Sequence, residues 1–334
     1  MSKLIVEANR IVEIKDHGNA DKLEVAIVKG WQCVVGKDMY KAGDLVIYVP
    51  VDAVFPQPLS DKIGVTKYLH KQRVKTAKLR GVISQGVIMS ANEVPDVKEG
   101  DDVATILGIT KWEPPTPGQC TSGTPRPQHP DFLRYTDIEN FKNYPDVLIE
   151  GEEIAITEKL HGSNLRAANN VAEKEGEAGH AGIHVGSHRM DFVDTPENLY
   201  WNAARKYRLA ELLPPGYQIF GEIYGKGIQK LTYDLQEFEV RFFDLMRGLQ
   251  YVDYEEFLVF CEVHGLPTVP ELYRGPWKKD LVAMADGKST IASHIREGVV
   301  IKPVKGRWDH KVGRVALKAI SEQYLLKDFD DGGH

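Results

Sequence analysis

A lysine at the end of an apolar strand pattern is the residue in this sequence best placed to do chemistry. Between residues 154 and 166, alternating apolar residues lead to Lys159, and the residues from His161 to Asn164 separate this pattern from a second apolar run. The spacing predicts a strand, a tight turn and another strand. At a strand end a rigid sheet aims the Lys159 amine into a cleft, and Gly162 lets the backbone approach a bound phosphate closely.

A nucleophilic lysine must lose its proton more easily than a free one. At a pKa of ~10.4 an amine is neutral in roughly one molecule in 2,500 at pH 7, so we expect the pKa of Lys159 to be lowered by about 3 units. Burial and nearby cations lower the pKa of an amine, and the same cations neutralise phosphate oxygens in a transition state. Further basic side chains and metal-binding carboxylates should therefore follow downstream.

The run Lys-Leu-His-Gly-Ser-Asn from Lys159 to Asn164 resembles the active-site motif of the covalent nucleotidyltransferases. This superfamily contains DNA ligases, RNA ligases and mRNA capping enzymes. The form with His161 and Asn164 resembles that of RNA ligases of the nick-sealing type. The resemblance implies that Lys159 attacks the α-phosphate of ATP, giving a lysyl-AMP phosphoramidate and pyrophosphate, with Mg²⁺ or Mn²⁺ as the metal ion.

Five later segments follow in the order that this superfamily uses. The resemblance assigns Phe243 to adenine stacking, with Phe242 on the opposite, core face of the strand. Many similar enzymes have two lysines spaced by one residue in the last segment, whereas here Ala316 and Ile320 flank Lys318. The implied catalytic residues are Lys159, His161, Glu297 and Lys318; the implied nucleotide-binding residues are Glu158, Gly162, Asn164, Arg189, Glu222, Phe243 and Lys302; the implied metal ligands are Glu222 and Glu297.

The bulk properties of the chain are those of an ordinary two-domain protein. Its 334 residues, 42% of them hydrophobic, suffice for two separate cores. No apolar run approaches the ~20 residues of a membrane span, and no signal-peptide pattern opens the chain, so we expect a soluble cytoplasmic protein. Cys33, Cys120 and Cys261 are odd in number and far apart, which argues against a disulfide framework or a zinc site. A net charge of −6 argues against indiscriminate nucleic-acid binding but leaves local patches open.

Short strands separated by turns fill the first part of the chain, and we assign residues 1–112 to an OB-like β-barrel that binds nucleic acid. The run from His17 to Leu23 resembles the opening hairpin of OB-type tRNA-binding modules. The expected strands are Leu4–Val6, Ile11–Ile14, Leu23–Val28, Trp31–Val35, Leu45–Val51, Val82–Met89 and Val103–Ile106.

A segregated basic stretch lies within this barrel. Residues 62–80 carry several basic side chains and no acidic one, with Tyr68 among them. In an acidic chain such a stretch predicts contact with a phosphate backbone, and a solvated loop without a partner is the alternative. The predicted nucleic-acid contacts are Lys71, Arg73, Lys75, Lys78 and Arg80.

Prolines cluster between Pro114 and Pro130, and we assign residues 113–143 to a linker. Residues 144–334 then mix helices and strands. Neither a GxxxxGK[ST] nor a GxGxxG run occurs, which excludes a P-loop or Rossmann nucleotide site. We expect one helix from Thr195 and Pro196 to Pro214, a second from Asp253 to His264 stopped at Gly265, and strands Tyr217–Ile223, Val240–Met246 and Gly298–Val304.

The expected fold class is α+β, with an N-terminal OB-like β-barrel followed by a nucleotidyltransferase domain. The resemblance implies a monomeric, ATP-dependent RNA ligase that joins 3′-hydroxyl and 5′-phosphate ends in a nicked duplex or an RNA–DNA hybrid. A GTP-dependent capping-type transferase and a catalytically inactive RNA-binding protein of the same fold are the alternatives, and DNA nick sealing is a further possible activity. This domain order, with an OB-like module ahead of the catalytic domain, resembles that of a group of RNA ligases.

Overall fold

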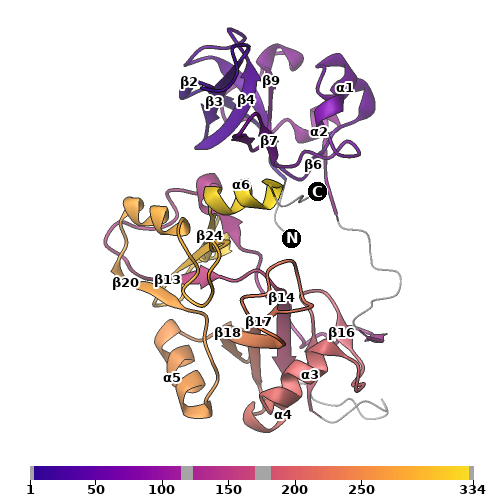
Figure 1. Cartoon of the computed structure of the whole chain (residues 1–334), viewed down its shortest axis with the longest axis vertical. Coiled ribbons are helices and arrows are strands. Elements are labelled where there is room, and N and C mark those ends of the chain that lie inside the picture. The colour runs from indigo at the N-terminus through magenta and orange to yellow at the C-terminus, as the bar shows by residue number, and fades with distance from the viewer. Residues whose placement is uncertain (1–3, 114–122, 170–181, 331–334) are drawn as a thin grey trace. The chain divides into compact units, whose positions relative to one another are not determined.

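The computed structural model describes residues 4–113, 123–169 and 182–330 (Figure 1). The chain separates into two compact units, one made of Met1–Pro115 and Leu325–His334 and the other of Thr116–Tyr324. Cys120 lies outside the described residues, whereas Cys33 and Cys261 are buried free thiols. Burial alone raises the pKa of the Cys33 thiol to about 12, so we interpret Cys33 as a structural core residue.

Antiparallel strands build the first unit around two apolar clusters. One cluster includes Ile47 and Phe55, and the other includes Val28 and Tyr48. Because Ile47 and Tyr48 are neighbours on one strand, alternation sends them to different clusters. The strands form sheets β1-β5-β9 and β2-β3-β4 and pairs β7-β8 and β6-β10. Their bounds are β1 Glu7–Arg10, β2 Glu13–Asp16, β3 Leu23–Val28, β4 Trp31–Gly36, β5 Leu45–Val49, β6 Ala53–Val54, β7 Ala77–Leu79, β8 Val82–Ser84, β9 Val87–Ser90 and β10 Thr110–Lys111; the α-helices are α1 Gln57–Lys62 and α2 Ala104–Leu107.

Several expected strands of this unit are wrong in detail; the second, for example, spans Glu13–Asp16 and not Ile11–Ile14. The first begins at Glu7, not at Leu4. The run 82–89 is split into β8 and β9 because Gly86 adopts a φ of +137°, where a Cβ would lie 2.5 Å from the Tyr48 ring. Residues 103–106 are mostly helical: Asp102 accepts a hydrogen bond from Ala104 N, and α2 follows at once.

A five-stranded sheet of order β12-β24-β21-β13-β20 carries the lysine motif in the second unit. Ile154 and Ile156 of β13 face an apolar cluster together with Val299 and Ile301 of β21. Alternation then puts Lys159 on the opposite face. The strands are β12 Glu139–Asn140, β13 Glu153–Lys159, β20 Glu271–Pro276, β21 Gly298–Pro303 and β24 Leu317–Ile320.

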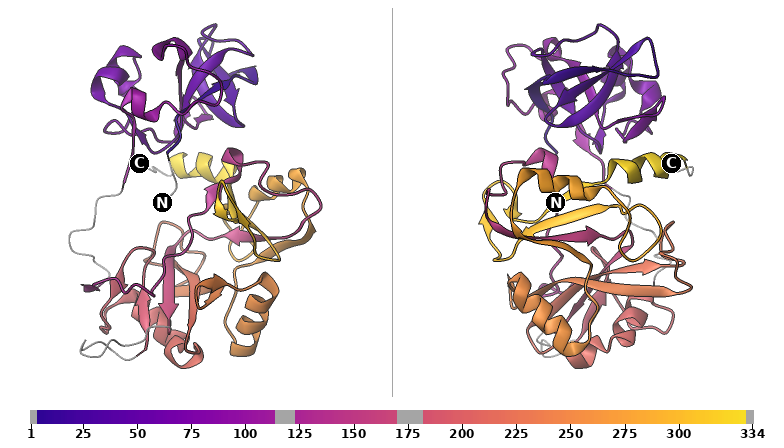
Figure 2. Two further views of the ribbon diagram at one scale, coloured as in Figure 1. Left: turned by 180° about the vertical axis from the view of Figure 1, so that it is seen from behind. Right: turned by 60° about the vertical axis from the view of Figure 1, so that its left-hand side comes forward.

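A seven-stranded sheet of order β11-β16-β15-β14-β17-β18-β19 supplies the other half of this unit. Its apolar side chains form one cluster with side chains from helices α3 and α5, and α5 lies beside β18 in Figures 1 and 2. The strands are β11 Pro125–Arg126, β14 Ser163–Ala168, β15 His184–Gly186, β16 Asp191–Phe192, β17 Tyr217–Gly225, β18 Phe238–Arg247 and β19 Gln250–Tyr251; a small pair is formed by β22 Trp308–Asp309 and β23 Gly313–Arg314.

The C-terminal ends of the helices agree with the prediction better than their N-terminal ends do. Helix α5 (Tyr254–His264) ends at Gly265 in the left-handed conformation, as predicted. The first expected helix is instead two, α3 (Leu199–Lys206) and α4 (Leu209–Leu212), since Arg208 adopts a φ of +53°. Asn198, and not Thr195, caps α3, because its Oδ1 accepts a hydrogen bond from Trp201 N. Helix α6 spans Glu322–Asp330.

The described part of the expected linker is folded. Strand β11 pairs with β16, and β12 pairs in parallel with β24. Between these strands Phe132 and Tyr135 are buried. Residues 123–143 are therefore part of the second unit, because their aromatic side chains need its core.

Candidate active site

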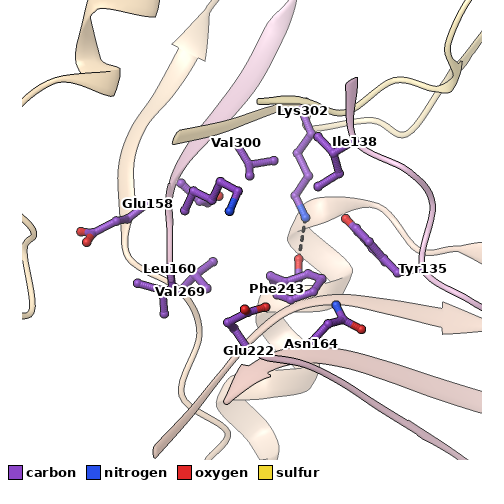
Figure 3. Close-up of a pocket in the computed structure, with 12 residues that line it drawn as sticks. Tyr135, Ile138, Glu158, Leu160, Asn164, Glu222, Phe243, Val269, Val300 and Lys302 are labelled. Carbon is purple, nitrogen blue, oxygen red and sulfur yellow. Dashed lines mark hydrogen bonds between the residues drawn. The ribbon is translucent and has the colours of Figure 1, made fainter. Parts of the chain in front are cut away.

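The two sheets of the second unit enclose a pocket (Figure 3). Lys159 is one of the residues that line it. The volume of the pocket is about 110 Å³, well above the ~10–15 Å³ that one water needs. Polar groups from both sheets converge on it, which suits a small polar ligand. The lining residues are Tyr135, Ile138, Thr157, Glu158, Lys159, Leu160, Asn164, Glu222, Phe243, Val269, Val300 and Lys302.

Lys159 is held by a carboxylate from the neighbouring strand. In the β13–β21 ladder Lys159 pairs with Gly298, so Glu297 comes just before its partner. Lys159 Nζ lies 2.6 Å from Glu297 Oε1 and donates a hydrogen bond to it. Gly298 is required here, because a Cβ would lie 2.1 Å from the Ala319 carbonyl oxygen.

The pKa of Lys159 differs from the expectation. Burial lowers it, but Glu297 and Glu222 together outweigh burial, and the pKa is raised above its ordinary value. The pKa of Glu222 is also raised, to about 8: burial raises it, Lys159 opposes this effect and Glu297 reinforces it. The acidic groups around the amine, Glu297 before Glu222, thus favour the ammonium form of Lys159.

The turn after β13 is fixed by the next strands. Gly162 was expected to make room for a phosphate, but a Cβ at this position would lie 2.1 Å from the Ile223 carbonyl oxygen, so the glycine makes room for β17. His161 N donates to Tyr233 Oη at 2.7 Å, and Gln229 Nε2 donates to the Gly162 carbonyl oxygen at 2.9 Å. These contacts hold the motif rigid.

A β-bulge aims an aromatic ring into the pocket. Gly221 of β17 pairs with Phe242, and Phe220 pairs with Asp244, so Phe243 is the additional residue on β18. Phe242 is fully buried in the core, as expected, whereas the Phe243 ring lines the pocket and meets the Tyr135 ring at 4.9 Å. Asn164 lies opposite Glu222 in the β14–β17 ladder, and its Oδ1 is buried without a hydrogen bond in the described chain.

Lys302 belongs to a buried ionic cluster. Its Nζ lies 2.6 Å from the Phe243 carbonyl oxygen and 3.2 Å from Asp244 Oδ2. Arg314 Nη2 and the Tyr135 hydroxyl, each 2.8 Å away, share the same Asp244 oxygen. Lys302 therefore reaches the pocket wall, as expected of a nucleotide contact, but its ammonium is already bound to the scaffold.

Glu158 presents its carboxylate to the other side of the sheet. Because it neighbours Lys159 on β13, alternation turns its side chain away from the pocket, as Figure 3 shows. Its Oε2 accepts hydrogen bonds from Thr290 N and Oγ1, both at 2.9 Å. The backbone of Glu158, rather than its carboxylate, is thus the part available to a ligand.

The remaining expected site residues fall into two groups. Lys318 of β24 pairs with Val300, which puts it on the Lys159 face of the sheet, and burial followed by Lys159 lowers its pKa. The His161 ring lies beside Glu297, with Nδ1 3.8 Å from Glu297 Oε2. Arg189 is exposed between β15 and β16 and does not line the pocket.

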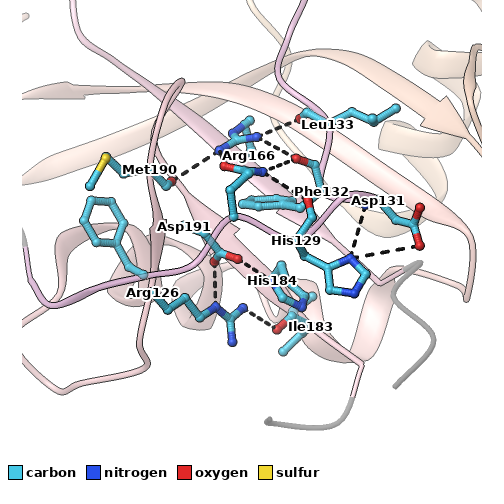
Figure 4. Close-up of polar contacts among 12 residues, drawn as sticks. Arg126, His129, Asp131, Phe132, Leu133, Arg166, Ile183, His184, Met190 and Asp191 are labelled. Carbon is cyan, nitrogen blue, oxygen red and sulfur yellow. Dashed lines mark hydrogen bonds and ion pairs between the residues drawn. The ribbon is translucent and has the colours of Figure 1, made fainter. Parts of the chain in front are cut away.

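Two residues that sequence reasoning missed, Tyr135 and Ile138, line the pocket from the segment assigned to the linker. Arg166 of β14 holds that segment in place (Figure 4). Its fully buried guanidinium donates to the Phe132 and Leu133 carbonyl oxygens at 3.0 and 2.9 Å. The alternation of apolar residues with arginine and acidic residues from Phe132 onward was the available signal, and the prolines before it obscured it.

The basic residues predicted to contact nucleic acid differ in their surroundings within the first unit. Arg73 pairs with Asp52 and lies 3.4 Å from the Trp112 ring centre, so it stabilises the fold. Lys71 and Arg80 are exposed, whereas Lys75 and Lys78 are half-buried.

The pocket fits a metal ion that binds together with phosphates. No group of three or more His, Cys, Asp or Glu side chains within the described ranges is placed to hold a metal. Mg²⁺ and similar ions, however, are held by one or two carboxylates together with substrate phosphates. Glu222 and Glu297 provide two, and Glu297 Oε2 is buried and makes no hydrogen bond in the described part of the chain. These carboxylate oxygens therefore suit a divalent cation that prefers oxygen ligands.

Among the described residues, the helices are all too short or too polar to cross a membrane. This agrees with the lack of long apolar runs in the sequence.

Comparison with known proteins gives matches over both units. A family model described as RNA ligase matches residues 152–320, and one described as an OB-fold domain matches residues 5–91. No curated protein matches the chain. The solved structure of Naegleria gruberi RNA ligase with PPi is 29% identical with a TM-score of 0.78, over 98% of this chain and 100% of that one. Variants of that enzyme solved with AMP and Mn, and with ATP and Mn, are 28% identical, with TM-scores of 0.79 and 0.77; each covers 98% of this chain, and 100% and 99% of theirs.

Proposed function

This chain belongs to the RNA ligase family, with an OB-fold domain ahead of the ligase domain as the sequence predicted, and we propose that it joins 3′-hydroxyl and 5′-phosphate ends of RNA at the expense of ATP. One observation carries the proposal: the Lys159 amine lies in a pocket beside two carboxylates and an aromatic ring. The similar Naegleria gruberi enzyme, solved with ATP and with AMP, supports ATP as the nucleotide.

Lys159 performs the first step as a nucleophile. Its nitrogen attacks the α-phosphorus of ATP, a nitrogen–phosphorus bond forms, and the bond to the pyrophosphate oxygen breaks. Glu297, 2.6 Å from the ammonium, lies where it can take the proton. The product is lysyl-AMP, in which the charge that held Lys159 to Glu297 is gone.

Two further transfers complete sealing. An oxygen of the RNA 5′-phosphate attacks the α-phosphorus, the nitrogen–phosphorus bond breaks, and Lys159 recovers a proton. The 3′-hydroxyl then attacks the RNA phosphate, loses its proton, and AMP leaves. Mg²⁺ or Mn²⁺ held by Glu222 and Glu297 would neutralise phosphate charge and lower the pKa of the attacking hydroxyl. Lys318, on the same sheet face as Lys159, is suited to hold phosphate oxygens.

The remaining pocket groups bind and orient the nucleotide. The Phe243 ring provides a stacking surface for adenine, and Asn164 and Glu222 lie together on the opposing strands. The rigid turn at Gly162 keeps these groups aligned with the Lys159 amine.

Transfer of label from ATP to the protein tests the proposal. Incubation with α-labelled ATP and Mg²⁺ should label the wild-type chain, Lys159→Ala should not be labelled, and the exposed loop variant Lys226→Ala should be labelled like the wild type. Labelling of Lys159→Ala would remove this lysine from the reaction. Labelling by GTP in place of ATP would favour a capping-type enzyme, and RNA binding without any labelling would favour an inactive binding protein.

A panel of nicked duplexes then defines the substrate. The duplexes differ only in ribose or deoxyribose on each side of the nick. We expect sealing to need ribose on the 3′-hydroxyl side, because proteins distinguish RNA through its 2′-hydroxyl and A-form shape. Equal sealing of an all-DNA nick would contradict an RNA substrate.

A further inference from the structure

A tyrosine from the C-terminal helix contacts the active-site histidine. Tyr324, in the first turn of α6, places its hydroxyl oxygen 3.3 Å from His161 Nδ1, and the two ring centres are 6.0 Å apart. The same Nδ1 lies 3.8 Å from Glu297 Oε2, and the other oxygen of Glu297 binds Lys159. Tyr324, His161, Glu297 and Lys159 therefore form a continuous row of contacts.

The position of Tyr324 is fixed by the residue that also holds Glu297. Ser321 is fully buried, and its backbone N donates to the Glu297 carbonyl oxygen at 2.9 Å. Its hydroxyl donates to Asp286 Oδ1 at 2.7 Å and accepts from Tyr324 N at 3.0 Å. The backbone on both sides of the His161 ring is thus tied to Ser321, so the distance between Tyr324 and Glu297 is set by the fold.

The backbone and the ring of His161 have different partners. Its backbone N–H donates a hydrogen bond to Tyr233 Oη, whereas its ring does not line the nucleotide pocket. A restricted rotation would keep the ring facing Glu297 Oε2, 3.8 Å from its Nδ1. The Tyr324 hydroxyl is placed to restrict its rotation, because a hydrogen bond to Nδ1 fixes both the ring angle and the identity of the protonated nitrogen.

The geometry points to Tyr324 as a positioning residue of the ligase, one that orients His161 beside Glu297 for the steps that follow adenylation of Lys159. This inference depends on the proposed function. It assigns the catalytic centre a residue outside the lysine motif, on a helix that follows the last strand of the five-stranded sheet.

Step-resolved kinetics of Tyr324→Phe test the inference. In single turnover, labelling of Lys159 by ATP should change less than twofold, whereas sealing of a pre-adenylated nicked RNA should slow about tenfold, the worth of one lost hydrogen bond in a preorganised site. Tyr273→Phe is a matched control: it removes a hydroxyl that binds the Pro276 carbonyl oxygen at an exposed position, and should leave both rates unchanged.

A double-mutant cycle separates positioning from a merely structural role. In a His161→Ala background, Tyr324→Phe should slow sealing by less than twofold, because its effect passes through the missing ring. A full tenfold effect in that background, or no effect of Tyr324→Phe alone, would overturn the inference.

A spectroscopic measurement keeps the inference separate from the proposed function. With ¹⁵N-labelled histidine in the full chain, Tyr324→Phe should shift the His161 Nδ1 resonance, and Tyr273→Phe should not. If wild-type protein takes no label from ATP, the proposed function fails, and this shift still decides whether Tyr324 controls the ring. An unchanged resonance would refute the contact.

Discussion

Lys159 and Lys302 lie on the same face of the five-stranded sheet, and each is paired with a carboxylate, yet their pKa values move in opposite directions. Burial lowers both. Around Lys159 the carboxylates of Glu297 and Glu222 prevail and raise its pKa. Around Lys302 burial prevails over Asp244, with Arg314 nearby as a further cation, and the pKa is lowered. The balance of carboxylates and cations near each amine separates the two lysines.

This difference distinguishes the proposed reactive site from an ion cluster that stabilises the fold. The Lys159 site has two acidic side chains around one amine, and when Glu222 loses its proton a divalent cation can balance the added charge. The Lys302 cluster has two cations on one Asp244 oxygen and closes itself with the Phe243 carbonyl oxygen. The first arrangement can exchange partners during a reaction, whereas the second ties β18 to the five-stranded sheet and so holds the pocket together.

The largest effect is expected from removing the Asp244 carboxylate, which Lys302 and Arg314 share. Asp244→Asn would leave Lys302 and Arg314 buried without a counter-charge, so we expect the free energy of unfolding to fall by about 3–5 kcal/mol. Chemical denaturation followed by fluorescence measures it. The matched control is Glu256→Gln, which breaks the exposed pair with Arg247 and should cost less than about 1 kcal/mol. Equal, small losses would mean that the buried cluster does not act as a scaffold.

At the Lys159 site, the raised pKa of Glu222 should make the free energy of unfolding depend on pH. Folding raises the pKa of Glu222 from 4.5 to about 8, so in this range the folded chain holds a proton that the unfolded chain has lost. The free energy of unfolding should therefore fall as pH rises through this window, by an amount on the order of 2 kcal/mol once screening is allowed for. Glu222→Gln, which cannot titrate, should flatten this dependence. Parallel curves for the two proteins would contradict the raised pKa.

The smallest effect is expected in the first unit. There Arg73 is neutralised by Asp52, whereas Lys71 is exposed. Lys71→Ala should weaken RNA binding several-fold and reduce the slope of log affinity against log salt by about 1. Arg73→Ala should instead lower stability by about 1 kcal/mol, through the lost ion pair and the lost contact with Trp112. Fluorescence anisotropy over a salt series checks the first result. An unchanged slope for Lys71→Ala would assign this stretch to solvent.

Local patterns were enough to predict the placement of several residues. Alternation on β18 separates Phe242 from Phe243, and Gly265 ends α5 as its lack of a side chain favours. The order of motifs along the chain predicted an OB-like domain followed by a nucleotidyltransferase domain, and the family matches confirm this order. These features depend on residues close together in sequence or on the order of segments.

Features that depend on tertiary contacts could not be predicted. The Lys159 amine meets Glu297 across a separation of 138 residues, and only the folded chain shows that this carboxylate raises the lysine pKa. The Tyr135 hydroxyl reaches Asp244 across 109 residues, which no local pattern indicates. Prolines near Tyr135 favoured a linker, and the packing of buried aromatic rings overrode that preference.

The bulge on β18 makes the Phe243 side chain independent of the strand pairing around it. Phe242 and Asp244 already match Gly221 and Phe220 without the residue between them, so position 243 is outside the ladder. Substitution at this single position can therefore reshape the pocket wall while the strand register stays intact. The same freedom is open to evolution, because one side chain on the pocket wall can change without rebuilding the sheet.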